Sequence, residues 1–506
     1  MLNTYQNKKE PDILEVISDL SNDEVFTPPA VAKQMLDLLP AEIWTDPSLR
    51  WIDPFTKTGV FLREITKRLL VGLEAVIPDD RERLEHILHN MVFGVAITEL
   101  TSLMSRRSLY CSKWADSDKS VVKFSSKQGN LIYTRVEHEF LRGRCSECFA
   151  TQAQHGGGLG TENFAYPMLH QEGRKFIERM FGLKFDIVVG NPPYQTDSDG
   201  GTRAVPLYHL FVKQAKALAP SHVVMITPSR WLAGGLGLGD FRREMLQEGK
   251  IRALVDFPNP RDVFPSVEIK GGVSFFHWEA DKSDSIVLST QYREGKVSFS
   301  GERNLSEFDV FVRDGEALPI LRKVLDKSSE FLEAHLSART AFGLVSNFSE
   351  FESAATKDAD ILYYASPSNR RLVGFVRASQ VNSNHDDIPF WKLLIPKAGS
   401  DGGQKLPDSV IGQTWLAEPN SVCSQTFLYA KFETKAQAES FDSYINTRFV
   451  RFLVSLRKIS VDTTRSSYRW VPVQKWDQTW TDAKLAEIYG IDSSELAHIE
   501  TMVKER

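Results

Sequence analysis

The stretch Lys184-Phe-Asp-Ile-Val-Val-Gly-Asn-Pro-Pro-Tyr194 decides the predicted fold. Its apolar first half predicts a buried strand that ends at Gly190. Pro192 and Pro193 have a fixed φ and no N–H, so they end the strand and hold a rigid loop after it. Ligands of open α/β sheets bind outside the carboxyl ends of the strands. The sequence therefore predicts an α/β fold with a functional loop at residues 191–194.

The chemistry of this loop suits a planar substrate that carries an NH₂ group. The Asn191 side chain and the Pro192 backbone carbonyl can each accept a hydrogen bond from that amine, and the Tyr194 ring can stack on the substrate. Such positioning aims the amine lone pair at an electrophile and supplies much of the rate. On these four residues alone an ordinary strand-end turn stays open as the alternative, because Asn and Pro are common turn residues.

The tetrapeptide Asn191-Pro-Pro-Tyr194 resembles the catalytic loop of amino-methyltransferases that use S-adenosylmethionine, above all the adenine-specific DNA methyltransferases. The resemblance implies that Asn191, Pro192, Pro193 and Tyr194 are the catalytic residues. It also implies a Rossmann-like, S-adenosylmethionine-dependent methyltransferase domain of the α/β class. The order of cofactor loop, catalytic loop and long C-terminal remainder is that of the gamma class of restriction–modification methyltransferases.

A second motif, Asp53-Pro-Phe-Thr-Lys-Thr-Gly59, follows an apolar run and precedes an amphipathic segment. A strand, a glycine-containing loop and a helix form the arrangement in which the backbone approaches a nucleotide-like ligand. The motif resembles the cofactor loop of the same family and departs from it at Lys57, where the family usually has glycine. The resemblance as a whole implies one set of cofactor-binding residues: Thr27, Asp53, Pro54, Phe55, Thr58, Gly59, Glu99, Asn130 and Asn191.

Three members of this set lie outside both loops. Thr27 is expected to cap a helix over residues 27–39, and the resemblance assigns it to the methionine end of the cofactor. Glu99 ends a predicted strand and is expected at the ribose hydroxyls; the alternative is an acid favoured by the dipole of a helix N-terminus. A third strand is expected at residues 121–124, with Asn130 at its exit beside the adenine ring of the cofactor.

An insertion over residues 133–183 is expected to precede the catalytic strand, and it contains Cys145-Ser-Glu-Cys148. A C-x₂-C pair in a cytosolic chain suggests zinc or redox chemistry. The predicted structural zinc site has four ligands, Cys111, His138, Cys145 and Cys148. His155 and His170 compete as ligands, and two unrelated thiols in a loop are the alternative.

The predicted organisation is a catalytic domain at 1–283, an α+β target-recognition domain at 284–480 and a C-terminal helical segment at 481–506. Residues 441–475 hold seven lysines or arginines against two aspartates, a net charge of +5. A patch of this kind suits a phosphate-binding groove, and one solvated helix face with core aromatic residues is the alternative. The expected DNA-binding residues are Arg448, Arg451, Arg465 and Arg469.

The composition of the 506 residues is that of a globular protein, with 42% hydrophobic and 25% charged residues. No apolar run reaches membrane-spanning length and the N-terminus lacks an apolar signal region, so no membrane partner is expected. Four cysteines do not suggest a disulfide scaffold, which favours a cytoplasmic protein. The net charge of −5 argues against indiscriminate nucleic-acid binding but permits a local basic groove.

Together these features predict a site-specific DNA methyltransferase that flips adenine out of the duplex and methylates its exocyclic amine. The expected partners are double-stranded DNA and a restriction endonuclease subunit. Two alternatives stay open. One is an RNA or protein-amide methyltransferase, which would act on a similar NH₂ group. The other is a catalytically silent DNA-binding subunit, which the departure at Lys57 keeps open.

Overall fold

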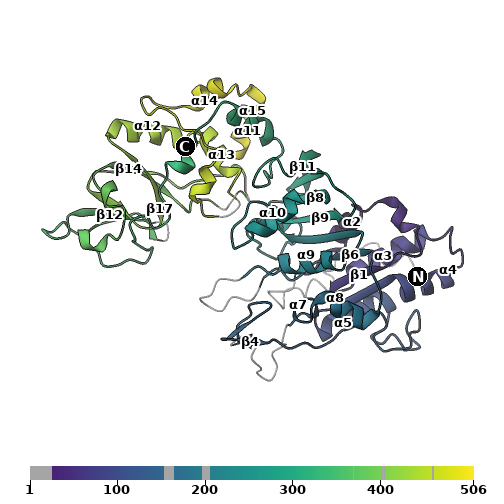
Figure 1. The fold of residues 1–506 in the computed structure, drawn as a ribbon. Coiled ribbons are helices and arrows are strands. Elements are labelled where there is room, and N and C mark those ends of the chain that lie inside the picture. The colour runs from purple at the N-terminus through teal and green to yellow at the C-terminus, as the bar shows by residue number, and fades with distance from the viewer. Residues whose placement is uncertain are drawn as a thin grey trace. The chain divides into compact units, whose positions relative to one another are not determined.

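The structure is a computed structural model that describes residues 25–152, 165–195, 205–367, 370–400, 403, 405–458 and 461–506. The chain divides into two compact units, which we call unit 1 (Met1–Asp309) and unit 2 (Val310–Arg506) (Figure 1). None of the helices among the described residues is long and apolar enough to cross a membrane.

A nine-stranded sheet forms the centre of unit 1, in the order β11-β10-β8-β9-β7-β6-β1-β2-β3. Its strands are β1 (Trp51–Thr56), β2 (Val92–Ala96), β3 (Leu131–Ile132), β6 (Ile187–Gly190), β7 (His222–Pro228), β8 (Ile251–Phe257), β9 (Val273–Glu279), β10 (Ile286–Arg293) and β11 (Lys296–Asn304). Neighbouring strands run parallel from β3 to β7, whereas β9 is antiparallel to both β7 and β8. The predicted α/β class is thereby confirmed.

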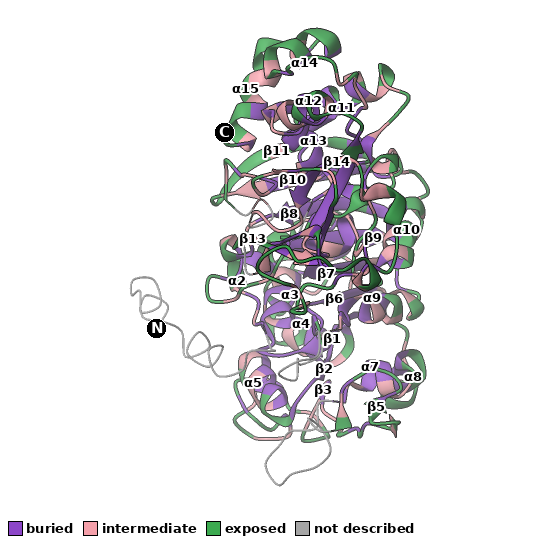
Figure 2. Ribbon diagram, turned by 90° about the vertical axis from the view of Figure 1, so that its left-hand side faces the viewer, coloured by how far each residue is buried: buried purple, intermediate pink, exposed green. Residues whose placement is uncertain are grey.

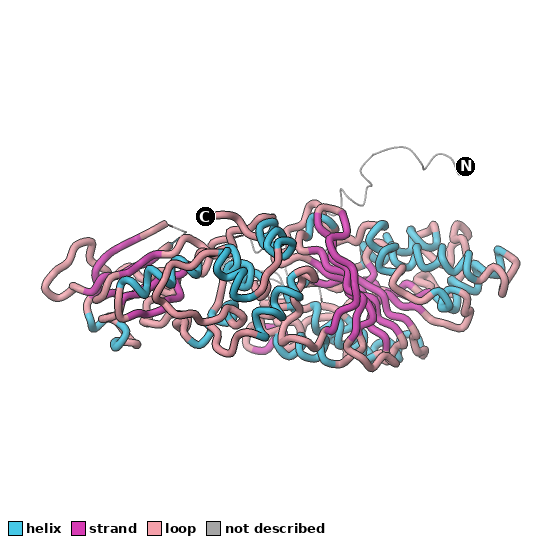
Figure 3. The backbone as a smooth tube through the Cα atoms, turned by 90° about the horizontal axis from the view of Figure 1, so that it is seen from above, coloured by secondary structure: helices cyan, strands magenta, loops and turns pink. Residues whose placement is uncertain are grey.

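Helices cover both faces of this sheet (Figure 3). They are α2 (Pro29–Leu36), α3 (Val60–Gly72), α4 (Asp80–His86), α5 (Glu99–Tyr110), α7 (Pro167–His170), α8 (Gly173–Phe181), α9 (Tyr208–Ala217) and α10 (Gly239–Gln247). Successive residues of β2 point to opposite faces. A Cβ on Gly94 would lie 2.8 Å from Leu62 of α3, while the ring of Phe93 lies 5.4 Å from that of Phe181 in α8. The sheet is therefore enclosed between the α3 layer and the α8 layer.

The central strands are buried along their whole length, as Figure 2 shows. All residues of β1, β2 and β6 are buried. Parallel strands covered on both faces read as nearly continuous apolar runs, which is why the run before Asn191 predicts β6.

The third strand lies later in the chain than its prediction. Residues 121–124 form no strand, because their N–H groups bond to the end of α5 and to the loop after it: Val121 donates to Tyr110 and Phe124 donates to Ala115, both at 3.0 Å. Leu131–Ile132 form β3 instead and pair with β2. A separate two-stranded hairpin, β4 (Phe140–Leu141) and β5 (Arg144–Cys145), stands apart from the large sheet.

Unit 2 contains two three-stranded sheets, β13-β12-β16 and β15-β14-β17. Its strands are β12 (Ile361–Ala365), β13 (Leu372–Val376), β14 (Trp391–Pro396), β15 (Trp415–Ala417), β16 (Ser421–Cys423) and β17 (Phe427–Phe432). Its helices are α11 (Ala317–Asp326), α12 (Lys435–Ile445), α13 (Arg448–Ser455), α14 (Asp482–Tyr489) and α15 (Ser493–Met502). One core joins both sheets through Tyr363, Leu394, Val422 and Tyr429.

The two units divide after Asp309 and not after residue 283. The reason is that β10 pairs with β8 of the large sheet and β11 pairs with β10, so both belong to unit 1. The expected C-terminal helical segment at 481–506 consists of α14 and α15, which contact α13 and belong to unit 2.

Candidate functional site

The two predicted loops meet at the carboxyl edge of the sheet. β1 and β6 are parallel neighbours, with Ile52 paired to Val188. A Cβ on Gly190 would lie 3.0 Å from the Oδ1 of Asp53 and 2.9 Å from a ring carbon of Phe55. The chain that leads into Asn191 thus passes directly against the Asp53 loop, and only glycine fits at this contact.

The Asn191 side chain is buried and its orientation is fixed. Its Nδ2 donates to the backbone oxygen of Val25 at 2.9 Å and to the Oγ1 of Thr27 at 3.1 Å. A carbonyl oxygen can only accept, so the amide nitrogen must face Val25. The Oδ1 atom is buried and has no hydrogen-bond partner among the residues that the structure describes. Asn191 therefore presents a buried acceptor without a hydrogen bond from any described residue, and the Tyr194 side chain is its neighbour.

Thr27 does not cap a helix as predicted. Helix α2 begins at Pro29, and the cap position is Pro28, which makes no side-chain cap bond. The prolines carry the chain into the helix with φ already near the helical value. The Thr27 hydroxyl instead accepts the hydrogen bond from Asn191, which brings this residue of the cofactor set beside the catalytic loop.

Lys57, the departure from the family's cofactor loop, is 7% exposed. Its Nζ donates to the backbone oxygen of Val25 at 3.1 Å, the same oxygen that accepts from Asn191. The lysine thus connects the Asp53 loop to the segment that also binds the Asn191 amide.

Burial dominates the electrostatics of the loops. It raises the pKa of Asp53 to about 7, an effect partly offset by the hydrogen bond from the Phe55 N–H and by the charge of Lys57. Burial also raises the pKa of Tyr194 well above its usual value, and the neighbouring Asn191 side chain lowers it only in part. The Tyr194 hydroxyl therefore stays neutral across the physiological range.

The rest of the cofactor loop is fixed by packing. Pro54 and Thr58 are buried, and the ring of Phe55 packs edge-on against Phe211 at 5.0 Å. Gly59 precedes α3 with φ +75°, and a Cβ there would lie 3.0 Å from the Cα of Ser105. Glycine at this position allows both the turn and the close approach of α3 and α5.

Glu99 and Asn130 lie at different edges of the sheet. Glu99 is exposed at the start of α5, just after the carboxyl end of β2. Asn130 precedes β3, and its Nδ2 donates to the backbone oxygens of Leu88 and His89 at 2.9 Å.

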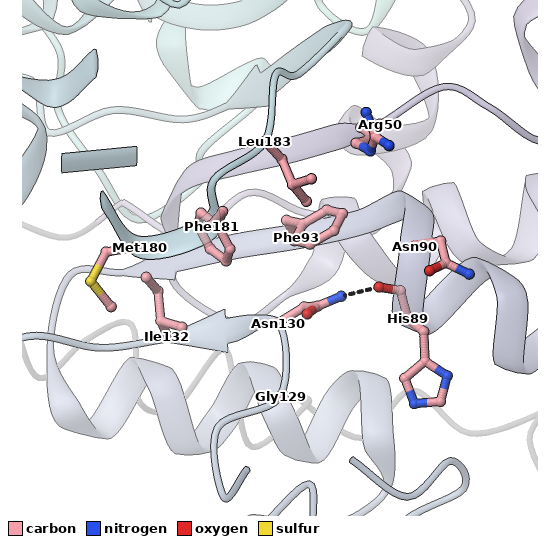
Figure 4. A pocket seen from close by; sticks show the side chains of 10 residues that line it. All are labelled: Arg50, His89, Asn90, Phe93, Gly129, Asn130, Ile132, Met180, Phe181 and Leu183. Carbon is pink, nitrogen blue, oxygen red and sulfur yellow. Dashed lines mark hydrogen bonds between the residues drawn. The ribbon is translucent and has the colours of Figure 1, made fainter. Parts of the chain in front are cut away.

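Figure 4 shows Asn130 in a pocket of about 330 Å³. Arg50, Asn90 and Leu183, which precede β1, β2 and β6 respectively, also line it. This pocket lies at the amino ends of the strands, so the structure does not bring Asn130 together with Asp53 and Asn191. Its strand was expected earlier in the chain, which would have placed Asn130 at the opposite edge.

The predicted metal ligands are brought together in part. The cluster contains His138, Cys145, Cys148 and His170, whose ligand atoms all lie within 4.8 Å of one another. Cys111 is exposed and does not belong to this cluster. His170, one of the competing ligands, takes the fourth place, and His155 lies outside the described residues.

The four predicted DNA-binding arginines differ in their surroundings. Arg451 is 1% exposed and donates to the backbone oxygens of Asn446, Thr447 and Ser409, so its burial contradicts a role at a DNA surface.

The other three arginines lie nearer the surface. Arg448 pairs with Glu500 and Glu505, and Arg469 pairs with Glu333. Arg465 is exposed. The predicted basic patch is therefore partly neutralised by acids that the sequence window did not include.

Comparison with known proteins identifies several that this chain resembles. The family model described as Eco57I restriction-modification methylase matches residues 90–264. An uncharacterized adenine-specific methylase of Mycoplasma pneumoniae is 33% identical over 323 residues, which cover 58% of this chain and 76% of that protein.

Two solved structures are similar at low sequence identity. The type I restriction-modification methyltransferase subunit from Streptococcus thermophilus is 13% identical over 56% of this chain and 52% of its own, with a TM-score of 0.34. A nuclease-deletion mutant of the Type ISP restriction-modification enzyme LlaGI, bound to a DNA substrate mimic, is 11% identical over 89% of this chain and 46% of its own, with a TM-score of 0.47. The chain spans about half the length of these solved proteins.

Proposed function

The chain belongs to the adenine-specific methylases of restriction–modification systems, and from this premise we propose its reaction. The chain methylates the exocyclic amine of an adenine that is flipped out of duplex DNA at a specific site. The methyl donor is S-adenosylmethionine. The chain spans only about half the length of the two solved proteins. The substrate and the partners of the whole protein are therefore proposed here.

The observation that carries the proposal is the orientation of Asn191. Both hydrogens of its amide nitrogen have acceptors in Val25 and Thr27, while its buried Oδ1 has no partner in the described part of the chain. A buried acceptor without a donor costs free energy unless a ligand supplies the donor. The amine of a flipped adenine supplies an N–H of the kind that this oxygen lacks.

The catalytic residues act by holding the amine in place. Asn191 Oδ1 and the Pro192 backbone oxygen accept one N–H each, which draws the nitrogen lone pair out of conjugation with the ring. Tyr194 stacks on the base, and Pro193 keeps the loop rigid. With S-adenosylmethionine bound, the amine nitrogen would form the new N–C bond as the C–S bond of the sulfonium broke to leave a thioether, and the methylated amine would then release its proton to water. No strong base is needed before attack, which agrees with a Tyr194 hydroxyl that burial keeps neutral.

The residues at the carboxyl edge fit the cofactor. S-adenosylmethionine supplies a methyl group on a positively charged sulfur, together with an ammonium group and ribose hydroxyls. Asp53 is a buried carboxyl group beside the catalytic loop, and ionisation of this group would balance positive charge. Glu99 stands exposed at the end of β2, where a carboxylate can accept from hydroxyls. Pro54, Phe55, Thr58 and Gly59 shape the loop between them.

The proposed partners are double-stranded DNA and a restriction endonuclease subunit, with unit 2 as the target-recognition domain. The proposed location is the cytoplasm, where a methylase of this kind would meet cellular DNA. The expected structural zinc ion takes no part in the reaction, because a closed site with four protein ligands leaves no position for substrate.

The decisive experiment measures transfer of labelled methyl groups to duplex DNA by the wild type and by Asn191→Ala. We expect a loss of about 10²-fold or more in the variant, as for removal of one preorganised polar contact at a reacting atom. Calorimetry should show that S-adenosylmethionine still binds, and circular dichroism should show an unchanged fold. Wild-type turnover by Asn191→Ala would refute the assigned role.

Assays with methyl-accepting substrates other than DNA distinguish the proposed function from its two alternatives. RNA and protein are offered with the same labelled cofactor, and label in either one instead of DNA would favour the RNA or protein-amide methyltransferase. A chain that binds no S-adenosylmethionine would be the silent DNA-binding subunit.

A further inference from the structure

Four metal-binding side chains converge in the segment before the catalytic strand. His138 follows β3, Cys145 ends β5, Cys148 lies in the next turn and His170 ends α7. The Nδ1 of His138 lies 3.4 Å from the Sγ of Cys148 and 3.1 Å from the Nε2 of His170. The same Nε2 lies 3.4 Å from the Sγ of Cys145. Three of the four residues are buried and the fourth is half-buried.

These separations suit one small tetrahedral ion. Zinc bonds of about 2.0–2.1 Å to nitrogen and about 2.3 Å to sulfur put neighbouring ligand atoms of a tetrahedron roughly 3.3–3.8 Å apart. Thiol–imidazole and imidazole–imidazole hydrogen bonds are the alternative explanation of these three contacts. A metal ion also accounts for the convergence of all four ligand atoms within 4.8 Å of one another. The set of two sulfurs and two nitrogens, without a carboxylate, is typical of a structural zinc site.

The backbone holds the ligands in place. The Cys145 N–H donates to Ala150 at 2.8 Å, and the Phe149 N–H donates to Cys145 at 3.1 Å. This turn closes around the cysteine pair. The Nδ1 of His170 lies 2.9 Å from the backbone oxygen of Tyr166, to which it can donate, and 2.9 Å from the Tyr166 backbone nitrogen, from whose N–H it can accept in the other tautomer. When Nδ1 carries the proton and donates it to that oxygen, the lone pair of Nε2 points to the cluster, which is the usual outer contact of a metal-bound histidine.

We propose that His138, Cys145, Cys148 and His170 bind one Zn²⁺ ion, and that this ion fixes the β4–β5 hairpin to α7. Strands β4 and β5 have two residues each, too few for a stable hairpin in water. Helix α7 contacts α8 and α9, and α8 leads into β6, the strand that ends at Asn191. The ion therefore contributes folding free energy to the segment that carries the chain to the catalytic loop. This inference does not depend on the methylated substrate.

The first test is the metal content of the full chain purified from zinc-replete cells without chelators. Mass spectrometry should find about one zinc ion per chain, as a closed four-ligand site requires. A thiol-reactive mercurial should release that ion to a chromogenic chelator. Replacement by Co²⁺ should give the intense visible bands of a tetrahedral ion together with thiolate-to-metal charge transfer.

Variants distinguish this ligand set from the one that sequence spacing suggests. His170→Ala and Cys145→Ser should lose zinc and unfold at lower temperature, whereas the matched control Cys111→Ser should keep both the ion and the melting temperature. Zinc retained by His170→Ala but lost by Cys111→Ser would overturn the assignment.

Two further results would contradict the site. If the wild-type chain, with all its thiols reduced, binds neither Zn²⁺ nor Co²⁺, the metal site is refuted. This test holds even if the ligand variants fail to fold. A reversible Cys145–Cys148 disulfide without metal would instead mark a redox pair.

Discussion

Lys57 and Asn191 donate hydrogen bonds to one and the same atom, the backbone oxygen of Val25. One donor belongs to the cofactor loop and the other to the catalytic loop, and the acceptor lies just before Thr27, which also contacts Asn191. A carbonyl oxygen has two lone pairs and can satisfy both donors. The residue that departs from the family's glycine pattern therefore shares with the Asn191 amide the acceptor that fixes its position.

Lys57→Met should weaken this arrangement. A hydrogen bond from a charged donor contributes about 1.5–3 kcal/mol when it is buried, so we expect a loss of unfolding free energy of that size, measured by urea denaturation. The kcat for methyl transfer should fall more than the affinity for DNA, because the variant leaves the Val25 segment less firmly held. Lys57→Arg should restore part of the rate.

The matched control is Lys67→Met, which removes a lysine of α3 whose side chain is 58% exposed and pairs with Glu64. It should leave the rate unchanged. A wild-type rate in Lys57→Met would show that Lys57 has no positioning role.

Thr27→Val tests the second contact of Asn191. Valine nearly preserves the shape of threonine but removes the hydroxyl that accepts from Nδ2. The loss of one buried neutral hydrogen bond, about 1 kcal/mol, corresponds to roughly a fivefold fall in single-turnover methyl transfer. Thr27→Ser keeps the hydroxyl and should keep most of the rate. Equal rates in the valine and serine variants would show that the hydrogen bond between Thr27 and Asn191 does not affect methyl transfer.

The raised pKa of Asp53 predicts a pH dependence of stability. Burial moves this pKa from an ordinary 3.8 to about 7 in the folded chain, so the folded state binds the proton more tightly than the unfolded state. The stability contributed by the protonated carboxyl group is present below about pH 4 and is lost as pH rises to about 7.

Asp53→Asn removes this titration. Between pH 5 and pH 7 the wild type should lose up to about 1.4 kcal/mol of unfolding free energy per pH unit relative to the variant. Urea denaturation of both proteins at several pH values measures the difference. A stability difference between the two proteins that stays constant from pH 5 to pH 7 would mean that Asp53 is already ionised in the fold.

Local sequence patterns predicted the strands and loops, but they did not predict every contact that the side chains of these loops make. The apolar run before Asn191 and the motif at Asp53 each predict a strand with a loop at its carboxyl end, and neighbouring parallel strands then bring the loops together. Asn130 was misplaced because the apolar residues 121–124 form a better strand pattern than the two-residue β3.

Spacing could not choose between His155 and His170, because the position of His170 depends on where the distant helix α7 ends. Cys111 was expected in the same cluster, but it is exposed at the end of α5 and does not belong to the group of His138, Cys145, Cys148 and His170. Thr27 has ordinary cap chemistry, and only the tertiary fold shows that its hydroxyl faces Asn191 instead.

Arg451 and Arg465 allow the proposed DNA surface of unit 2 to be separated from its core. Arg451 lies in α13 within a run of buried residues from Phe449 to Val454, and its guanidinium donates to three backbone oxygens. Arg451→Met leaves those oxygens with fewer donors and should cost about 1–3 kcal/mol of stability, seen as a lower melting temperature. At temperatures where the variant is folded, the salt dependence of its DNA binding should match that of the wild type.

Arg465→Ala should behave in the opposite way. The side chain is exposed, so the melting temperature should stay within error of the wild type. If Arg465 contacts a phosphate, its loss reduces the slope of log K against log salt by about 1 and weakens binding to all sequences alike. Fluorescence anisotropy with one specific and one unrelated duplex, each at four salt concentrations, measures both effects. An unchanged slope together with unchanged affinity would exclude Arg465 from the DNA interface, and the role of this exposed arginine would then lie elsewhere than in phosphate binding.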